Sequence, residues 1–171
     1  MLAGAGLLVL CVSTAIWLRP PTLEQVARDG LKAVESRDPD LLLRHITRAE
    51  RDRLSLDTHK VRRFLDLFVG HRLTGFVLSG TPVITAFPSS RQLFADQEYV
   101  HPDGRRVFVS ISTAVTQEGP RIRGVIGSLV LAMLRTDLPA GAAMPGGRAR
   151  FAFWGDALQR AIPELEPTGI R

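Results

Sequence analysis

The chain has 171 residues, a length that suits one domain with its own hydrophobic core and excludes two full domains. Its 22 basic and 17 acidic residues give a net charge of +5, but arginines alternate with acids, as in RAERDRL, which is typical of a solvated surface and argues against a nucleic-acid partner. The lone cysteine, Cys11, excludes an internal disulfide, and the four histidines are too widely spaced for a metal motif, so we expect neither a metal nor a cofactor.

The chain begins with an uncharged apolar stretch, Leu2–Leu18, which is just long enough to cross a bilayer as a helix. A tryptophan and an arginine at its end are typical of a membrane interface. We therefore expect residues 1–19 to form a transmembrane anchor or an uncleaved signal, and residues 20–171 to form a single domain. A cleaved signal peptide that ends near Ala15 is the alternative.

The expected side of the membrane depends on the charges that flank the apolar stretch. The basic residues after the apolar stretch would keep the domain in the cytoplasm if the positive-inside rule were applied literally. A start codon assigned a few residues late, however, would have removed the basic residues that normally precede such a stretch. We therefore expect a single-pass protein of the cell membrane, with the lipid bilayer as a partner through Leu2–Leu18 and the domain outside the cytoplasm.

Three amphipathic helices are predicted after the two prolines, over residues 22–38, 39–54 and 58–70. Thr22 begins the first of them as the N-cap of a capping box. Asp38 and Pro39 supply the N-cap and the first residue of the second. Gly70 is the expected C-cap of the third.

After Gly70 the apolar residues alternate with polar ones, which is the period of β-strands. The predicted strands cover residues 72–80, 82–87, 93–101, 105–115 and 121–126. An apolar stretch over residues 127–135 is predicted as a short buried helix, with a strand as the alternative. A loop of small residues then leads to a C-terminal helix over residues 148–162.

In the long hairpin in the middle of the chain, the turn length and the acidic residues predict which residues pair across the two strands. A three-residue turn pairs His101 with Arg105. Its alternative, shifted by one residue, would bury the carboxylates of Asp96 and Glu98 beside valines, at a cost of several kcal/mol each. The predicted buried face of the hairpin is therefore formed by Leu93, Ala95, Gln97, Tyr99 and His101 with Val107, Val109, Ile111 and Thr113.

The stretch ARDGLKAVESRDPDLLLRHI reads as a helix, an acidic break and a second helix. Followed by an antiparallel sheet, it resembles the nuclear-transport-factor-two-like superfamily over about residues 22–135. The resemblance implies an α+β fold shaped like a cone, in which three N-terminal helices pack on a curved antiparallel sheet of four or more strands around an apolar pocket. It further suggests a membrane-anchored bacterial member of that superfamily, with a C-terminal helix after the sheet.

The resemblance assigns a role to the polar residues of the buried hairpin face. Gln97 and Tyr99 would project into the cone. The pocket candidates are accordingly Gln97, Tyr99, His101, Val107, Val109 and Ile111. In the alternative interpretation, the Tyr99 hydroxyl reaches solvent at the rim and the Gln97 amide binds a loop carbonyl.

The sequence favours a binding role over catalysis. Ketosteroid isomerases and polyketide cyclases of the superfamily hold a carboxylate base inside the cone, whereas Asp96 and Glu98 face away from it here. We therefore expect no catalytic residue, and a non-catalytic binding or interaction domain for a small apolar ligand or a protein, with a homodimer left open. The alternatives are a proton-transfer enzyme and an assembly component of a bacterial secretion or lipid-import machine.

Overall fold

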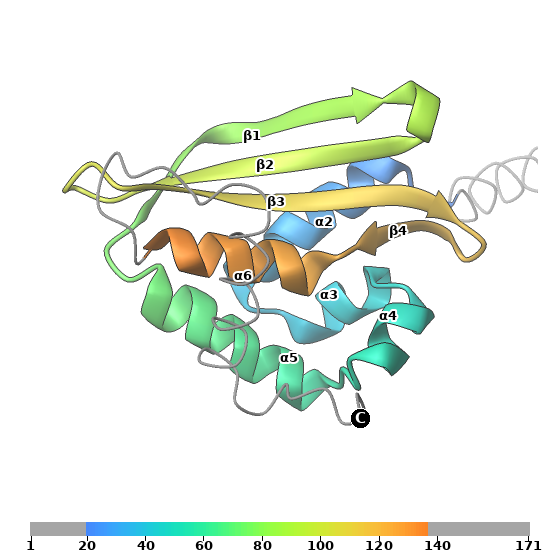
Figure 1. The fold of residues 1–171 in the computed structure, drawn as a ribbon, viewed down its shortest axis with the longest axis horizontal. Helices are drawn as coiled ribbons and strands as arrows, with labels where there is room; N and C mark the ends of the chain where they lie inside the picture. Colours follow the sequence, from blue (N-terminus) through green and yellow to red (C-terminus); the bar gives the residue numbers. More distant parts are fainter. Residues whose placement is uncertain (1–19, 137–171) are drawn as a thin grey trace, which may run out of the picture.

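The computed structural model describes residues 20–136, so the predicted anchor and the predicted C-terminal helix lie outside the described residues. The described part has an α+β fold, with a four-stranded antiparallel sheet in the order β1-β2-β3-β4 and several helices (Figure 1). No helix among residues 20–136 is long and apolar enough to span a bilayer. The anchor within residues 1–19 stays a prediction.

Helix α2, Leu23–Ser36, packs across the sheet. It begins as predicted, because the Thr22 hydroxyl accepts a hydrogen bond from the backbone of the first turn at 3.1 Å. Gly30 lies at the closest approach to the sheet, where an added Cβ would be 2.7 Å from Ile122 and 3.0 Å from Ile111. The glycine that weakens an isolated helix by about 1 kcal/mol therefore permits close packing here.

The second predicted helix is in fact two, α3 (Pro39–His45) and α4 (Arg48–Arg53). Between them, the backbone of Ile46 forms a parallel bridge with Ile122 of the sheet. Thr47 then restarts the helix, since its hydroxyl accepts a hydrogen bond from the first turn of α4 at 3.2 Å. The prediction of one continuous helix was wrong because this pairing with a distant strand interrupts it.

The third predicted helix continues further than expected. Helix α5, Thr58–Leu65, passes directly into a π-helical turn, η1, Asp66–Arg72. Gly70 lies inside η1 and is not the C-cap, which is Leu73; the first glycine after η1, Gly75, has a positive φ of 81°. Fully buried Phe68 keeps this segment against the core, which accounts for the longer helical path.

Strand β1, Val77–Phe87, is a single edge strand where two strands were predicted. Its pairing with β2 shifts between Ser79 and Val83, and Gly80 at this shift has a φ of 64°. The residues that signalled a loop therefore form a β-bulge within one strand. Pro82 has no backbone N–H group to donate. It is tolerated there because a residue in a bulge of an edge strand does not have to donate a hydrogen bond to a neighbouring strand.

Strands β2 (Gln92–Val100) and β3 (Arg106–Thr116) form the long hairpin in the predicted register. The amide of His101 donates to the carbonyl of Arg105 at 2.9 Å, which closes the three-residue turn. Cross-strand partners on the inner face are Leu93 with Thr113, Ala95 with Ile111, Gln97 with Val109 and Tyr99 with Val107.

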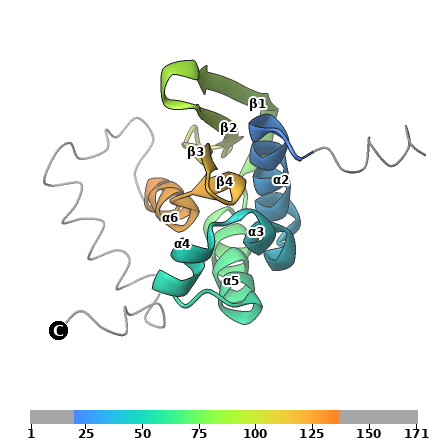
Figure 2. The ribbon, with the colours of Figure 1, turned by 90° about the vertical axis from the view of Figure 1, so that its right-hand side faces the viewer.

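Strand β4, Gly119–Arg123, pairs only with the end of β3. The predicted strand 121–126 is thus shorter at its C-terminal end, and helix α6, Val125–Thr136, follows at once. This helix confirms the predicted buried helix. It runs beside β3 toward the β2–β3 turn, and Figure 2 shows α2 and α6 on two sides of β3 and β4.

The core lies between the inner face of the sheet and the helices. Its largest fully buried side chains include Leu42, Ile46, Leu65, Phe68, Ile111, Ile122 and Leu129. The opposite face of β1, β2 and β3 stays open among the described residues, since Val83 is 63% exposed and Phe108 is 51% exposed.

Candidate functional site

The six pocket candidates lie on the inner side of the hairpin, as the register requires. Val107, Val109 and Ile111 have no exposed surface and belong to the core. Gln97 and Tyr99 are also buried. The structure thus brings these five residues together, while a ligand cavity beside them stays a prediction.

Backbone carbonyls at the bulge in β1 and beside it surround the buried amide of Gln97. Its side-chain amide nitrogen lies 3.2 Å from the carbonyl oxygen of Ser79, 3.5 Å from that of Gly80 and 3.2 Å from that of Glu98. A buried amide that finds backbone acceptors satisfies its hydrogen-bonding needs within the fold. Its presence on the inner face therefore requires no ligand.

Tyr99 is held between apolar cross-strand neighbours, Leu78 on β1 and Val107 on β3. Burial, followed by the nearby negative charge of Glu35, raises the pKa of Tyr99 to about 12. The phenol therefore keeps its proton at physiological pH and can donate a hydrogen bond but not act as a base.

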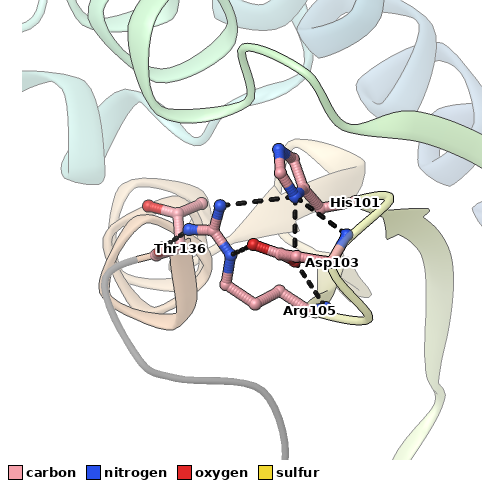
Figure 3. Close-up of polar contacts among 4 residues, drawn as sticks. All are labelled: His101, Asp103, Arg105 and Thr136. Atoms are coloured by element: carbon pink, nitrogen blue, oxygen red, sulfur yellow. Dashed lines mark hydrogen bonds and ion pairs between the residues drawn. The ribbon is translucent and has the colours of Figure 1, made fainter.

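His101 lies at the end of the hairpin, in a polar group that we call the turn cluster: His101, Asp103, Arg105 and Thr136 (Figure 3). Asp103 is 2.8 Å from His101 and 2.7 Å from the Arg105 side chain. Arg105 also donates to the Thr136 carbonyl at 2.8 Å. The hydrogen bond from the Arg105 backbone is the main cause that lowers the pKa of Asp103. The turn cluster fastens the C-terminal end of α6 to the hairpin.

The candidate site that the structure reveals lies on the other side of the sheet. We define the outer face by the side chains of β1, β2 and β3 that alternate away from the core: Val77, Val83, Phe87, Phe94, Asp96, Glu98, Val100, Arg106 and Phe108. Val77, Val83, Phe87 and Phe108 are each 46% to 63% exposed. Phe87 and Phe94 also stack edge to face, with ring centroids 5.5 Å apart. A gathered apolar surface of this kind is typical of an interaction site.

A groove of about 600 Å³ opens in the outer face at the bulge. It is lined by Ser79, Gly80, Thr81, Val83, Asp96, Glu98 and Phe108. The bulge explains why it forms there: three residues of β1, from Gly80 to Pro82, lie opposite Gln97 alone, so β1 bows away from β2. The groove therefore combines an aliphatic and an aromatic wall with two carboxylates.

The two carboxylates of the groove differ in their surroundings. Glu98 forms an ion pair with Arg106 at 2.7 Å, and the Arg106 side chain is 62% exposed. Asp96 accepts a hydrogen bond from the Ser110 hydroxyl, and burial raises its pKa. The alternating sequence pattern predicted that both carboxylates lie on this face. It did not predict the bulge that forms a groove beside them.

Two further polar contacts in the described chain join helices to one another. Glu50 is buried and accepts a hydrogen bond from the backbone of Gly124 at 2.9 Å, which ties α4 to the start of α6. His45 is buried 3.1 Å from Asp29, and burial lowers the pKa of His45 although Asp29 opposes that shift. Among the residues described, no group of three or more metal-binding side chains gathers.

No family model, no curated protein and no solved structure matches this chain. The resemblance to the nuclear-transport-factor-two-like superfamily therefore stays a prediction, and the function has to be argued from the geometry of the outer face.

Proposed function

We propose that the protein is a membrane-anchored interaction domain, outside the cytoplasm, that binds a partner protein through the outer face of its sheet. The observation that carries this proposal is the groove at the bulge, where exposed Val83 and Phe108 stand beside the carboxylates of Asp96 and Glu98. An apolar patch that contains fixed charges offers both binding energy and selectivity.

The chemistry of the groove favours one class of partner segment. Carboxylates and an aromatic ring together attract a cation on an apolar stem, because the cation can pair with the acids and lie over the ring. Arg106 already forms an ion pair with Glu98, but its side chain is exposed, so it can turn toward solvent and leave the Glu98 carboxylate to a cation of the partner. We therefore expect a partner segment in which arginine or lysine stands next to aromatic or aliphatic residues.

The position of the proposed anchor suits this role. Helix α2 starts at Leu23, whose carbonyl accepts a hydrogen bond from Thr113 of β3 at 3.3 Å. Figure 1 shows that this start lies at the end of the molecule where β1 turns into β2. An anchor in residues 1–19 would therefore hold that end near the membrane and leave the outer face extending away from it.

A photo-cross-linking amino acid at position 108 tests the proposal in cells that carry the protein naturally. Val115 is the matched control position, because it lies on the same strand with the same 51% exposure but alternates to the other face. We expect position 108, and not position 115, to yield an adduct with a basic and apolar segment of another protein. The double variant Asp96→Asn/Glu98→Gln should reduce that adduct. Equal adducts from both positions, or none from position 108, would refute the proposal.

A further inference from the structure

A second pocket, of about 610 Å³, lies where helix α4 meets β2, β3 and β4. The polar side chains that line it are those of Thr47, Glu50, Arg53, Gln92, Ser112 and Arg123. We propose that this pocket binds a phosphate group, carried either by a lipid headgroup or by a soluble compound. It shares no lining residue with the groove at the bulge, so the inference stands apart from the partner proposed for the outer face.

The fold brings together two basic residues that are far apart in the sequence. Ser112 and Arg123 are cross-strand partners on β3 and β4, so their side chains lie on the same side of the sheet. The bridge between Ile46 and Ile122 holds the chain beside β4 just before α4 begins. Arg53, the last residue of α4, therefore reaches the same pocket as Arg123.

Four of the lining side chains are donors without an acceptor in the described chain. Among residues 20–136, the side chains of Arg53, Gln92, Ser112 and Arg123 form no hydrogen bond and no ion pair. Two guanidinium groups, an amide and a hydroxyl thus line one pocket with their donors free. Such a set suits a ligand that supplies several acceptors at once.

A phosphate group fits these donors better than a carboxylate does. A guanidinium group binds either anion through two parallel N–H donors. One guanidinium group is enough to occupy both oxygens of a carboxylate. A phosphate group has further oxygens, which can accept from the second guanidinium group, from the Ser112 hydroxyl and from the Gln92 amide.

The carboxylate of Glu50 also lines this pocket, and its charge opposes an anion. Glu50 is only 8% exposed, and its Oε2 accepts a hydrogen bond from the backbone of Gly124 at 2.9 Å. Its carboxylate is thus already used in joining α4 to the start of α6. Two guanidinium groups outweigh this one carboxylate among the described lining residues, so the pocket keeps a positive charge.

The place of the pocket in the molecule suggests one source of phosphate. Figure 1 shows α4 at the end of the molecule where α2 starts. An anchor in residues 1–19 would bring this end, and the pocket with it, close to the phosphates of lipid headgroups. Because this step rests on the proposed anchor, the experiment separates a lipid from a soluble phosphate compound.

Calorimetric titration of the full-length protein in a neutral detergent tests the pocket, with inorganic phosphate as the probe and sodium chloride of equal ionic strength as the reference. We expect saturable binding that Arg53→Gln/Arg123→Gln weakens about tenfold or more, because hydrogen bonds to a charged group are lost. Arg44→Gln/Arg48→Gln is the matched control. It removes the same charge from exposed residues nearby that do not line the pocket, and it should leave binding unchanged.

A second variant fills the pocket without removing an arginine. Ser112→Asp places a carboxylate opposite Arg123 and should abolish phosphate binding while the protein keeps its fold. Several results would overturn the inference. They are the absence of saturable binding to the unchanged protein, unchanged binding in either pocket variant, and an equal loss in the control variant.

Native mass spectrometry of the same proteins, with phosphatidylglycerol added to the detergent, identifies the source. A lipid adduct that the unchanged protein and the control keep, and that Arg53→Gln/Arg123→Gln loses, would assign the pocket to a lipid headgroup. Phosphate binding without such an adduct would assign it to a soluble phosphate compound.

The two proposals fail separately, because Phe108 does not line this pocket. If position 108 captures a partner while phosphate binding is absent, the proposed function stands and the phosphate site is wrong. If phosphate binds as expected but position 108 captures no other protein, the phosphate site stands and the proposed function is wrong.

Discussion

Replacing Gln97 by methionine tests whether the buried amide serves the bulge or a ligand. Methionine keeps nearly the same volume and removes only the donor and acceptor groups, so no cavity forms. In the structure, the amide nitrogen is the hydrogen-bond donor to the carbonyls of Ser79 and Gly80. The substitution would leave these two carbonyls without that donor.

The expected loss follows from the surroundings of those carbonyls. A buried polar group without a partner costs about 1–3 kcal/mol. Gly80 is exposed and Ser79 is partly exposed, so water can replace the donor in part, and we expect a loss of about 1–3 kcal/mol for the whole change rather than for each carbonyl. For a chain of this size, that corresponds to a decrease in Tm of about 2–4 °C for each kcal/mol.

Urea unfolding of Gln97→Met, followed by circular dichroism, measures this loss, and hydrogen exchange should become faster around the bulge in β1. Gln92→Met is the matched control, because Gln92 lies on the same strand but on its other face. We expect the control to keep the urea midpoint of the unchanged protein. If Gln97→Met is as stable as the unchanged protein, or more stable, the bulge does not depend on this amide, and a role toward a ligand becomes the better explanation.

Further predictions concern the core, the helix contact and pH. Val109→Asp should abolish folding because it buries a charge, whereas Ser112→Asp, opposite Arg123 on the outer side of β3, should keep its Tm in circular dichroism melts. Gly30→Ala should lower the urea midpoint, since overpacking against the sheet at about 1–3 kcal/mol exceeds the helix gain of about 1 kcal/mol; a higher midpoint would contradict the close packing. Because burial lowers the pKa of His45, the unfolded chain takes up this proton first, and the stability should be level above about pH 6.5 and fall below it. His45→Gln should remove that fall between pH 6.5 and 5, and equal losses in both proteins would show that His45 is not its cause.

The local features of this protein could be predicted from the sequence because neighbouring residues decide them. Thr22 caps α2 through atoms three residues away, and it does so in the structure as expected. The register of the hairpin depended on the cost of burying Asp96 and Glu98, and the cross-strand partners confirm it. The outward direction of both carboxylates followed from the alternation of side chains in a strand.

The features that were missed depend on residues far apart in the chain. The break after α3 lies where Ile46 pairs with the distant Ile122, and the bulge in β1 lies opposite Gln97, whose amide donates to the Ser79 carbonyl. Composition around Gly80 signalled an interruption but could not distinguish a loop from a bulge, because the two differ only in what the flanking residues pair with. The groove exists only when β1 bows over the carboxylates of β2. The residue types of the candidate site were therefore determined by the sequence, whereas its shape was decided by the tertiary structure, since a cavity between strands forms only when distant segments pair.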